Sequence, residues 1–486
     1  MKKRLGAVNA KVIGIVVAVL AILGLVFAFS QGGGGKSGSN SGALKTLDII
    51  GNEFTNTIED FMPDMGIKEF NEKIQKDGAS STNFKLAGDV QPTGKIELGL
   101  DMKSDPNNKK MQMQFDVGAI GAALNVTLTA INNEMFLNIP TMYEKPIKIN
   151  FETIGTDLQS DTFKKMAGGS DSSELAKYKD LKVNLFSDYS NPSKAKAEFE
   201  KYISPELTAL EKKAKIEKAE VDKAFADKLK EEGSTRADLE QVNIEVDSKD
   251  FKALLLKVID FYEMVQKSQI SGLPEEDYQS SFKKVKEDIE KFQMPEKINI
   301  KVVSSKSIPV VISFPGTDNK IANIVFAGNK NSTDKIVFYE SGDSASNEKI
   351  TFDMKTGDKE NTLKFDLAGV AEINSSYKKD SKELSMNIKD ESSIVLTLKG
   401  KYTDVKKGES YKFDIESLEI PSKSGKALKF SGAIETSAAK PDIKAVGDSV
   451  EVLKLNETDL MKFIMDVNKN LKNNYGGLMS MMNSMR

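Results

Sequence analysis

Apolar and polar residues alternate one by one over long stretches of this chain. The first such region runs from Lys95 to Phe151 and is interrupted by turn residues at Ser104–Asn108 and Asn132–Asn133. A second region of the same kind runs from Ile298 to Val452. Strict alternation places one side of a strand in the core and the other in water, which is typical of an antiparallel meander.

Outside these two regions, apolar residues recur every three or four positions, which predicts helices. The first helix covers residues 44–62 and ends at Pro63, and the second contains Ile67, Phe70 and Ile74 and ends before Gly78. The last begins at Asn456, where Asp459 follows three residues later as in a capping box, and ends before Gly476.

Residues 192–295 also have a mainly helical pattern. Ser204 and Pro205 are expected to begin a helix that continues to Glu232, although residues 213–221 also fit a polar strand. A short strand is expected at Asn243–Asp247. Two further helices are expected, one capped by Ser248 and one opened by Pro274.

The order helices, meander, helices, meander, helix predicts an α+β fold. Its main element is a large antiparallel, curved, half-barrel-like β-meander sheet packed on helices. The exported part divides into residues 44–295 and residues 296–486, and the sequence leaves open whether these form one domain or two. The apolar residues Leu98, Phe115 and Phe365 are expected to be buried beneath the helices.

The N-terminus carries the pattern of a membrane anchor. Residues 12–29 are uncharged and mostly apolar, and as a helix they would be about 27 Å long, enough to cross a bilayer. The four positive charges before them predict a cytoplasmic tail at 1–11 and an extracytoplasmic bulk, so the protein is expected to cross the cell membrane once. Residues 30–43 form a Gly/Ser linker with a reach of roughly 20 Å. Cleavage after the apolar segment is the alternative.

Composition excludes several kinds of chemistry. The chain contains no His, no Cys and no Trp, which removes Ser-His-Asp catalysis, thiol nucleophiles, disulfides and the usual zinc sites. With 69 basic and 72 acidic residues, the charge balance gives no reason to expect nucleic-acid binding. Lys355-Thr356-Gly357 matches a motif of serine β-lactamases, but its position between two alternating runs predicts a hairpin turn. No cofactor, metal site or catalytic residue is predicted.

The alternating faces carry an unusual number of methionines, whose flexible side chains suit an apolar cavity. The candidate ligand-facing residues are Met102, Met111, Met113, Phe115 and Met135. Next to them, Gly118–Ala123 consists of small residues and fits either an opening over the sheet or a loop. The Met-rich C-terminus fits a frayed helix end, an apolar latch or a Cu(I) site.

Short helices followed by an amphipathic meander, on an exported and tethered chain, resemble the LolA/LppX-like lipoprotein-carrier superfamily over residues 83–151 and 298–455. The resemblance implies a curved sheet over helices with acyl chains held between them. Two functions are therefore considered. The first is a membrane-anchored cell-envelope protein without enzymatic activity, with a structural or interaction role and the membrane, through residues 12–29, as its partner. The alternative is a binding or carrier module for a lipid or other apolar ligand in a sheet–helix cavity.

Overall fold

The computed structural model describes residues 58–484, apart from 91–93, 120–121, 167–174, 188, 190–191, 292–293, 307, 316–319, 330–331, 342–348, 369, 391–392 and 422–426. The expected membrane span at 12–29, the linker at 30–43 and most of the expected helix at 44–62 lie outside this description. Within the described part of the chain, every helix is too short or too polar to span a bilayer.

A single sheet of 20 strands dominates the structure and confirms the large antiparallel sheet. From one edge to the other, its strands are β8 (Lys215–Ala219), β9 (Leu239–Asp247), β11 (Lys297–Ser305), β12 (Ile308–Pro315), β13 (Ile321–Gly328), β14 (Thr333–Ser341), β15 (Lys349–Thr356), β16 (Glu360–Leu367), β17 (Ala371–Lys378), β18 (Glu383–Asp390), β19 (Ser393–Lys406), β20 (Ser410–Ile420), β21 (Leu428–Ser437), β1 (Ser80–Val90), β2 (Gly94–Asp105), β3 (Lys110–Ala119), β4 (Ala122–Ile131), β5 (Glu134–Asn138), β6 (Ile147–Asn150) and β22 (Val450–Glu451). The short strands β7 (Lys182–Val183) and β10 (Ile270–Ser271) form a separate pair.

The two predicted meanders join where β1 pairs with β21. Phe84 lies opposite Ile434, and Gly88 lies opposite Phe430. At the far end of the first meander, β22 pairs in parallel with β6, and the other pairings in the large sheet are antiparallel. The C-terminal chain therefore contacts both ends of the first meander and makes the two meanders one sheet.

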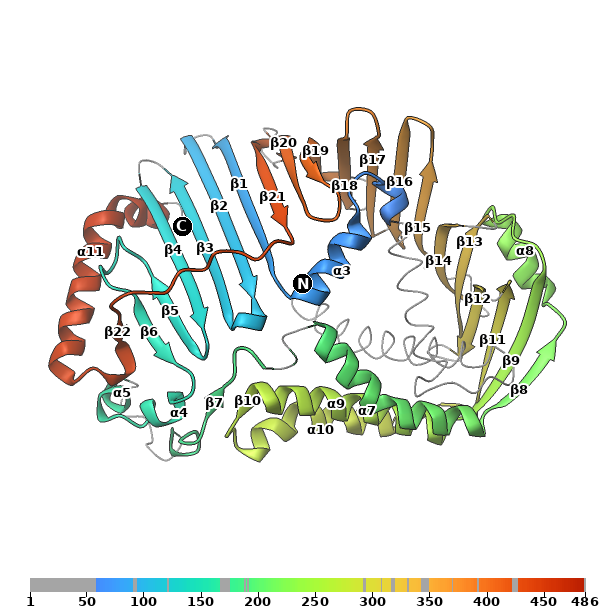
Figure 1. Cartoon of the computed structure of the whole chain (residues 1–486), viewed down its shortest axis with the longest axis horizontal. Coiled ribbons are helices and arrows are strands. Elements are labelled where there is room, and N and C mark those ends of the chain that lie inside the picture. Colours follow the sequence, from blue (N-terminus) through green and yellow to red (C-terminus); the bar gives the residue numbers. More distant parts are fainter. Residues whose placement is uncertain are drawn as a thin grey trace.

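The sheet arches from β22 and β6, over the top of Figure 1, to β9 and β8. The helices are α3 (Ile67–Asp77), α4 (Ile154–Asp157), α5 (Asp161–Met166), α7 (Pro192–Lys213), α8 (Lys223–Glu231), α9 (Ser248–Gln269), α10 (Glu275–Lys291) and α11 (Glu457–Ser484). Figure 1 shows α7, α9 and α10 along the open side of the arch, α3 inside it and α8 outside it. We call the two faces of the sheet the inner and outer faces accordingly.

The largest core lies between the helices and the inner face of β9 and β11–β14. Phe251 and Leu254 of α9 and Ile203 of α7 pack against strand residues such as Ile300 and Ile312. Each of these side chains is almost completely buried, and a buried Leu, Ile or Phe contributes roughly 1.5–3 kcal/mol relative to exposure. This core anchors the helices to one end of the arch.

The outer face of the same strands is also covered. Phe225 and Leu229 of α8 pack on Val303, Val311 and Val325. Because both faces of β12 and β13 are buried, their sequences are apolar at consecutive positions instead of alternating. The strongly apolar run Ile308–Pro315 thus marks the part of the sheet that is covered on both sides.

Residues 58–77 cover part of the inner face further along the arch. Phe61 packs with Met354 and Tyr377, and all three are almost completely buried. The buried amide of Asn361 donates hydrogen bonds of 2.9 and 3.0 Å to the carbonyl oxygens of Asp60 and Phe61. Both the apolar contacts and the amide therefore hold this segment on β16 and β17.

Several helix boundaries differ from the predictions. Ser204 does not begin a helix, since Pro205 lies inside α7. The expected helix to Glu232 is interrupted by β8, so the strand alternative for residues 213–221 is correct. Ile216 of β8 pairs with Ile244 of β9, and this edge pairing overrides the helical propensity of the Ala, Glu and Lys residues around it.

The other predicted elements are mostly confirmed. The helix expected at Ile67 is α3, and the helix after Pro274 is α10. Asp247 rather than Ser248 caps α9, by accepting a hydrogen bond from the backbone N–H of Lys249. Further corrections concern α11, which continues past Gly476 to Ser484, and β1, which the pattern did not predict.

Asn456 and Asp459 bond to each other as expected for a helix start. The side chain of Asn456 accepts a hydrogen bond of 2.9 Å from the backbone N–H of Asp459 and donates one of 2.7 Å to its carboxylate. The predicted capping interaction is therefore present at the beginning of α11.

Candidate ligand-binding face

The strand register brings the five predicted ligand-facing residues onto the inner face of β2, β3 and β5. Met102 lies opposite Met113, and Ala130 lies opposite both Met111 and Met135. Opposite residues in antiparallel strands point to the same side of the sheet. Phe115, two positions beyond Met113 on β3, belongs to the same face, and we call the set Met102, Met111, Met113, Phe115 and Met135 the methionine patch.

The methionine patch is only partly covered by protein. Met111 is 45% exposed, Phe115 40% and Met102 36%. The expectation that Phe115 is buried beneath helices is therefore wrong, while Leu98 and Phe365 are half-buried. The reason is the position of the helices, because the core made by α7 and α9 includes β9 and β11–β14 and not β2–β4.

Exposure of the inner face changes from one end of a strand to the other. On β20, Phe413 and Ile415 are 4% exposed, whereas Ile420 at the end of the strand is 36% exposed. On β16, Asn361 is completely buried and Leu367 is 38% exposed. Residues 58–77 account for this difference, because they cover the start of β16 and leave its end open.

Two tyrosines on the inner face, the buried Tyr377 and the half-buried Tyr402, have raised pKa values. Burial, together with the nearby carboxylate of Asp64, raises the pKa of Tyr377, whose hydroxyl donates a hydrogen bond of 3.3 Å to Asp64. Burial also raises the pKa of Tyr402. Both phenols are therefore neutral at physiological pH, as suits a surface for an apolar ligand.

Strong charge clusters lie on the outer face instead. The carboxylate of Glu232, whose side chain is 2% exposed, meets the ammonium groups of Lys228, Lys335 and Lys349 at 2.9, 2.8 and 2.6 Å. Burial alone would raise the pKa of Glu232, but hydrogen bonds from the three lysines outweigh it and lower the pKa to about 2. This cluster ties the end of α8 to β14 and β15.

A second carboxylate on the outer face has a similar pattern at the surface. Hydrogen bonds from Lys364, Asn374 and Lys389 lower the pKa of Glu372 to about 2. Its distances to the two lysines are 2.6 and 2.9 Å, and its side chain is 22% exposed. These ion pairs join Glu372 of β17 to the neighbouring strands β16 and β18, so we interpret them as structural contacts within the sheet.

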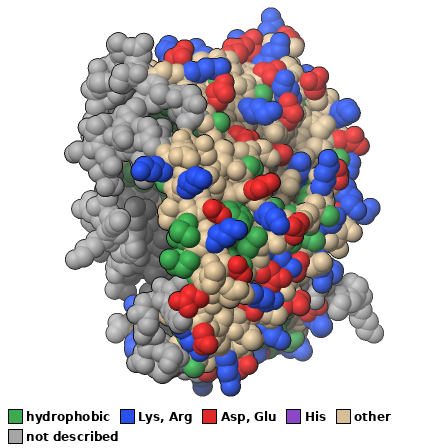
Figure 2. All heavy atoms as spheres, turned by 90° about the vertical axis from the view of Figure 1, so that its left-hand side faces the viewer, with side chains coloured by type: hydrophobic (Ala, Val, Ile, Leu, Met, Phe, Trp, Pro, Cys, Tyr) green, Lys and Arg blue, Asp and Glu red, His purple; other side chains and the backbone are tan. Residues whose placement is uncertain are grey.

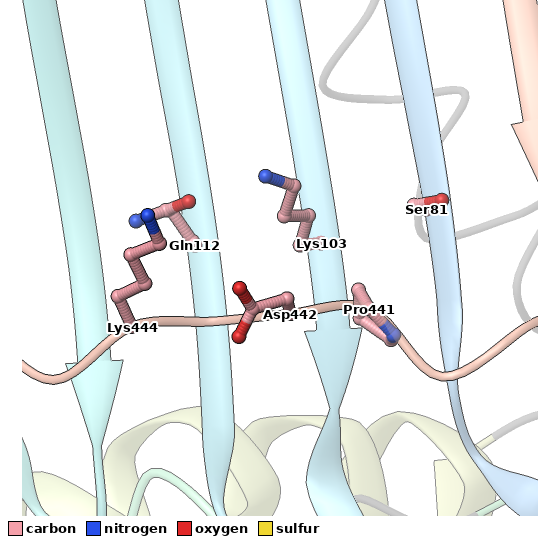
Figure 3. Close-up of a pocket in the computed structure, with 6 residues that line it drawn as sticks. All are labelled: Ser81, Lys103, Gln112, Pro441, Asp442 and Lys444. Atoms are coloured by element: carbon pink, nitrogen blue, oxygen red, sulfur yellow. The ribbon is translucent and has the colours of Figure 1, made fainter.

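Residues 438–449 cross the outer face of β1–β4 as an extended strap (Figure 1). Ile443 of the strap is buried, and its carbonyl oxygen accepts a hydrogen bond of 3.2 Å from Lys110. Figure 3 shows Pro441, Asp442 and Lys444 of the strap beside Lys103 and Gln112, and together these residues line a shallow groove. The groove is open, and its lining also includes Ser81, which lies opposite Lys103 in the strand register.

A second shallow groove lies on the outer face of β15–β18. It contains Lys355 of the Lys-Thr-Gly motif, and the backbone N–H of Gly357 donates to the carbonyl oxygen of Glu360 at 3.1 Å. The motif therefore forms the predicted hairpin turn. Among the described residues, acidic side chains do not gather into a cluster that could hold a metal ion.

Two other sequence features can be placed. Gly118–Ala119 ends β3 and Ala122–Ala123 begins β4, so the small residues extend a hairpin, with residues 120–121 outside the description. The Met-rich C-terminus belongs to α11 up to Ser484. Figure 2 faces the side of the molecule where α11 lies and shows acidic and basic side chains mixed around a few hydrophobic ones. Met461 and Met465 of α11 are 53% and 60% exposed.

No protein-family model matches the chain, and no curated protein sequence matches it. One solved structure found in the comparison is a mutant of the vaccine antigen transferrin-binding protein B (TbpB) from Haemophilus parasuis Hp5. It is 7% identical and covers 74% of this chain and 75% of its own, with a TM-score of 0.12. A likeness this weak carries no argument about fold or function.

The exposed apolar residues at the ends of strands were not singled out in the sequence. They include Val117, Leu367 and Ile420, each within the last few residues of its strand. A usable signal was present, because a large aliphatic residue directly beside a turn is less often buried than one in the middle of a strand. Alternation alone assigns such a residue to a face and says nothing about what covers it.

Proposed function

We propose that the protein is a non-enzymatic, membrane-tethered extracytoplasmic binding protein whose inner sheet face holds the acyl chains of a lipid. The observation that supports this most strongly is the methionine patch, an apolar surface that the described helices leave partly open. The expected anchor at residues 12–29 would keep the protein beside its source of ligand. A purely structural role gives no reason to leave such a surface open.

Binding would proceed by burial of apolar surface, without a covalent step. Each methylene group moved from water onto the inner face contributes about 0.8 kcal/mol. Methionine side chains adapt to acyl chains of different shape, because they have three rotatable bonds and a polarisable sulfur. The phenols of Tyr377 and Tyr402 are neutral, so these two side chains add no charge that would repel a hydrocarbon chain.

A photo-crosslinking experiment tests this function in the full chain. With p-benzoyl-phenylalanine at position 115, irradiation of cells is expected to give a covalent lipid adduct, detected as added mass on the peptide from β3. Position 114 is the matched control, since Gln114 is the next residue on the same strand and its side chain points to the outer face, where it bonds Asp116.

The outcome separates binding from general membrane proximity. Adducts at position 115 and none at position 114 would support the proposal, and replacing Met111 by Ser should then lower the adduct yield about five-fold, corresponding to roughly 1 kcal/mol of lost apolar contact. Equal adducts at both positions, or only protein adducts at position 115, would reject it.

A further inference from the structure

Exposed apolar side chains line one edge of the arch along its whole top. Adjacent strands are antiparallel, so the ends of β14, β16, β20 and β3 and the start of β19 lie along the same edge. The exposed residues at this edge include Val117, Phe338, Leu367, Val370, Ile394 and Ile420. Their exposed fractions run from 36% to 59%, and we call this set the apolar rim.

The opposite edge of the sheet differs. There, Asn361 and Tyr377 are completely buried beneath residues 58–65, and the turn at Gly408 donates a backbone hydrogen bond to the carbonyl oxygen of Met65. Asn107 in the turn after β2 bonds the carbonyl oxygen of Asp77 at the end of α3. This edge is therefore covered by the chain itself at β16, β17 and the turn before β20, although Met111 near the same edge of β3 is 45% exposed, whereas the other edge is open.

Charged residues beside the apolar rim are paired with each other. Lys429 lies 2.9 Å from Glu419, next to Ile420, and Lys389 lies 2.9 Å from Glu372, next to the turn that carries Val370. Lys320 and Glu340 form a 3.2 Å pair near Phe338. Because these charges neutralise each other, the rim has little net charge with which to attract a charged partner. This favours insertion of its apolar side chains into an apolar environment.

We propose that the apolar rim dips into the surface of a lipid bilayer and that lipid chains pass across it onto the inner face. The proposal rests on the function proposed above and names the membrane surface as the partner. The rim is continuous with the inner face, because Leu367 and Ile420 end the same apolar rows that contain Phe365 and Leu418. Apolar contacts spread singly over many strand ends suit a fluid surface better than a rigid protein partner, which needs a compact, densely packed centre.

The chain contains no cysteine, so single labelling sites can be introduced without removing any. A polarity-sensitive NBD label on Val370→Cys, in the full chain reconstituted into vesicles of zwitterionic phosphatidylcholine, is expected to show increased, blue-shifted emission that quencher lipids reduce. Ile394→Cys provides a second position. Asp358→Cys is the control, because this exposed residue lies in the turn after β15, at the covered edge.

Each outcome decides the proposal. The proposal is supported if the labels at positions 370 and 394 show blue-shifted emission relative to the label at position 358. This difference should stay unchanged in about 0.5 M salt, where surface charge is screened. Identical emission at all three positions overturns the proposal, as does a shift that needs anionic lipid and disappears in salt. A shift that grows with protein density in the vesicles would assign the rim to a second copy of the chain and also overturns it. The crosslink at position 115 is independent of these labels, so lipid binding can persist when rim insertion fails.

Discussion

Replacing Glu232 with Gln is expected to lower the free energy of unfolding by about 3 kcal/mol, because it removes the buried carboxylate on which the ammonium groups of three lysines converge. The loss should appear first at α8, whose last turn the carboxylate holds against Lys335 of β14 and Lys349 of β15. Urea unfolding measures the total effect, and hydrogen exchange of residues 223–231 measures the local one.

Glu231→Gln is the matched control, since Glu231 is the preceding residue and also pairs with Lys228, at 2.8 Å, but its side chain is 65% exposed. An exposed ion pair contributes about 0–1 kcal/mol, so this variant should unfold almost like the parent protein. Equal effects of the two substitutions would show that burial of the Glu232 cluster does not matter for stability.

The same carboxylate gives a pH dependence with a definite sign. The pKa of Glu232 is lowered from 4.5 to about 2 in the folded protein, so the stabilisation is complete above the ordinary pKa. It is lost as the pH falls from about 4.5 towards 2, because the unfolded chain then binds a proton that the folded chain resists. Over this range the parent protein should lose stability more steeply than Glu232→Gln, and parallel curves would contradict the assignment.

Gly432→Ala is expected to cost about 3 kcal/mol, because β21 lies against β1 without room for a side chain at this position. A Cβ atom on Gly432 would lie 1.8 Å from the carbonyl oxygen of Lys85 and 3.0 Å from the Cα of Leu86. Both are backbone atoms, so relief requires the two strands to separate. Urea unfolding and proteolysis of the strap at 438–449 would report the separation.

Gly447→Ala provides the comparison on the same segment of chain. A Cβ atom at Gly447 would meet no other atom within 4 Å, so its substitution should change stability by less than about 0.5 kcal/mol. If Gly432→Ala were equally harmless, the pairing between β1 and β21 could not be as close as the register requires.

The faces of the strands could be predicted from the sequence because side-chain direction depends only on local alternation. Met102, Met113 and Phe115 share a face for this reason, and the register confirms it. What covers that face could not be predicted, because it depends on where α7 and α9 pack after folding. Phe115 was therefore assigned to the right side of the sheet but to the wrong environment.

Long-range pairing was the other limit of prediction. β8 was ambiguous because its stability comes from pairing with β9 and not from its own residues, of which only Ile216 is strongly apolar. β1 was missed because Gly88 and polar residues interrupt its alternation, and its partner β21 lies at the other end of the chain. Neither signal is contained in a short window of sequence.

The pairing of Gly88 with Phe430 also has a consequence for how the molecule is made. During synthesis, β1 appears early and can pair with β2 at once, but its other neighbour, β21, arrives only after almost the whole chain has been made. Contacts this distant in sequence slow folding, and until they form, the edge of β1 that faces β21 is a template for wrong association with other chains. The protein should therefore depend on holding factors during its biogenesis, and that dependence should be strongest for truncations that lack β21.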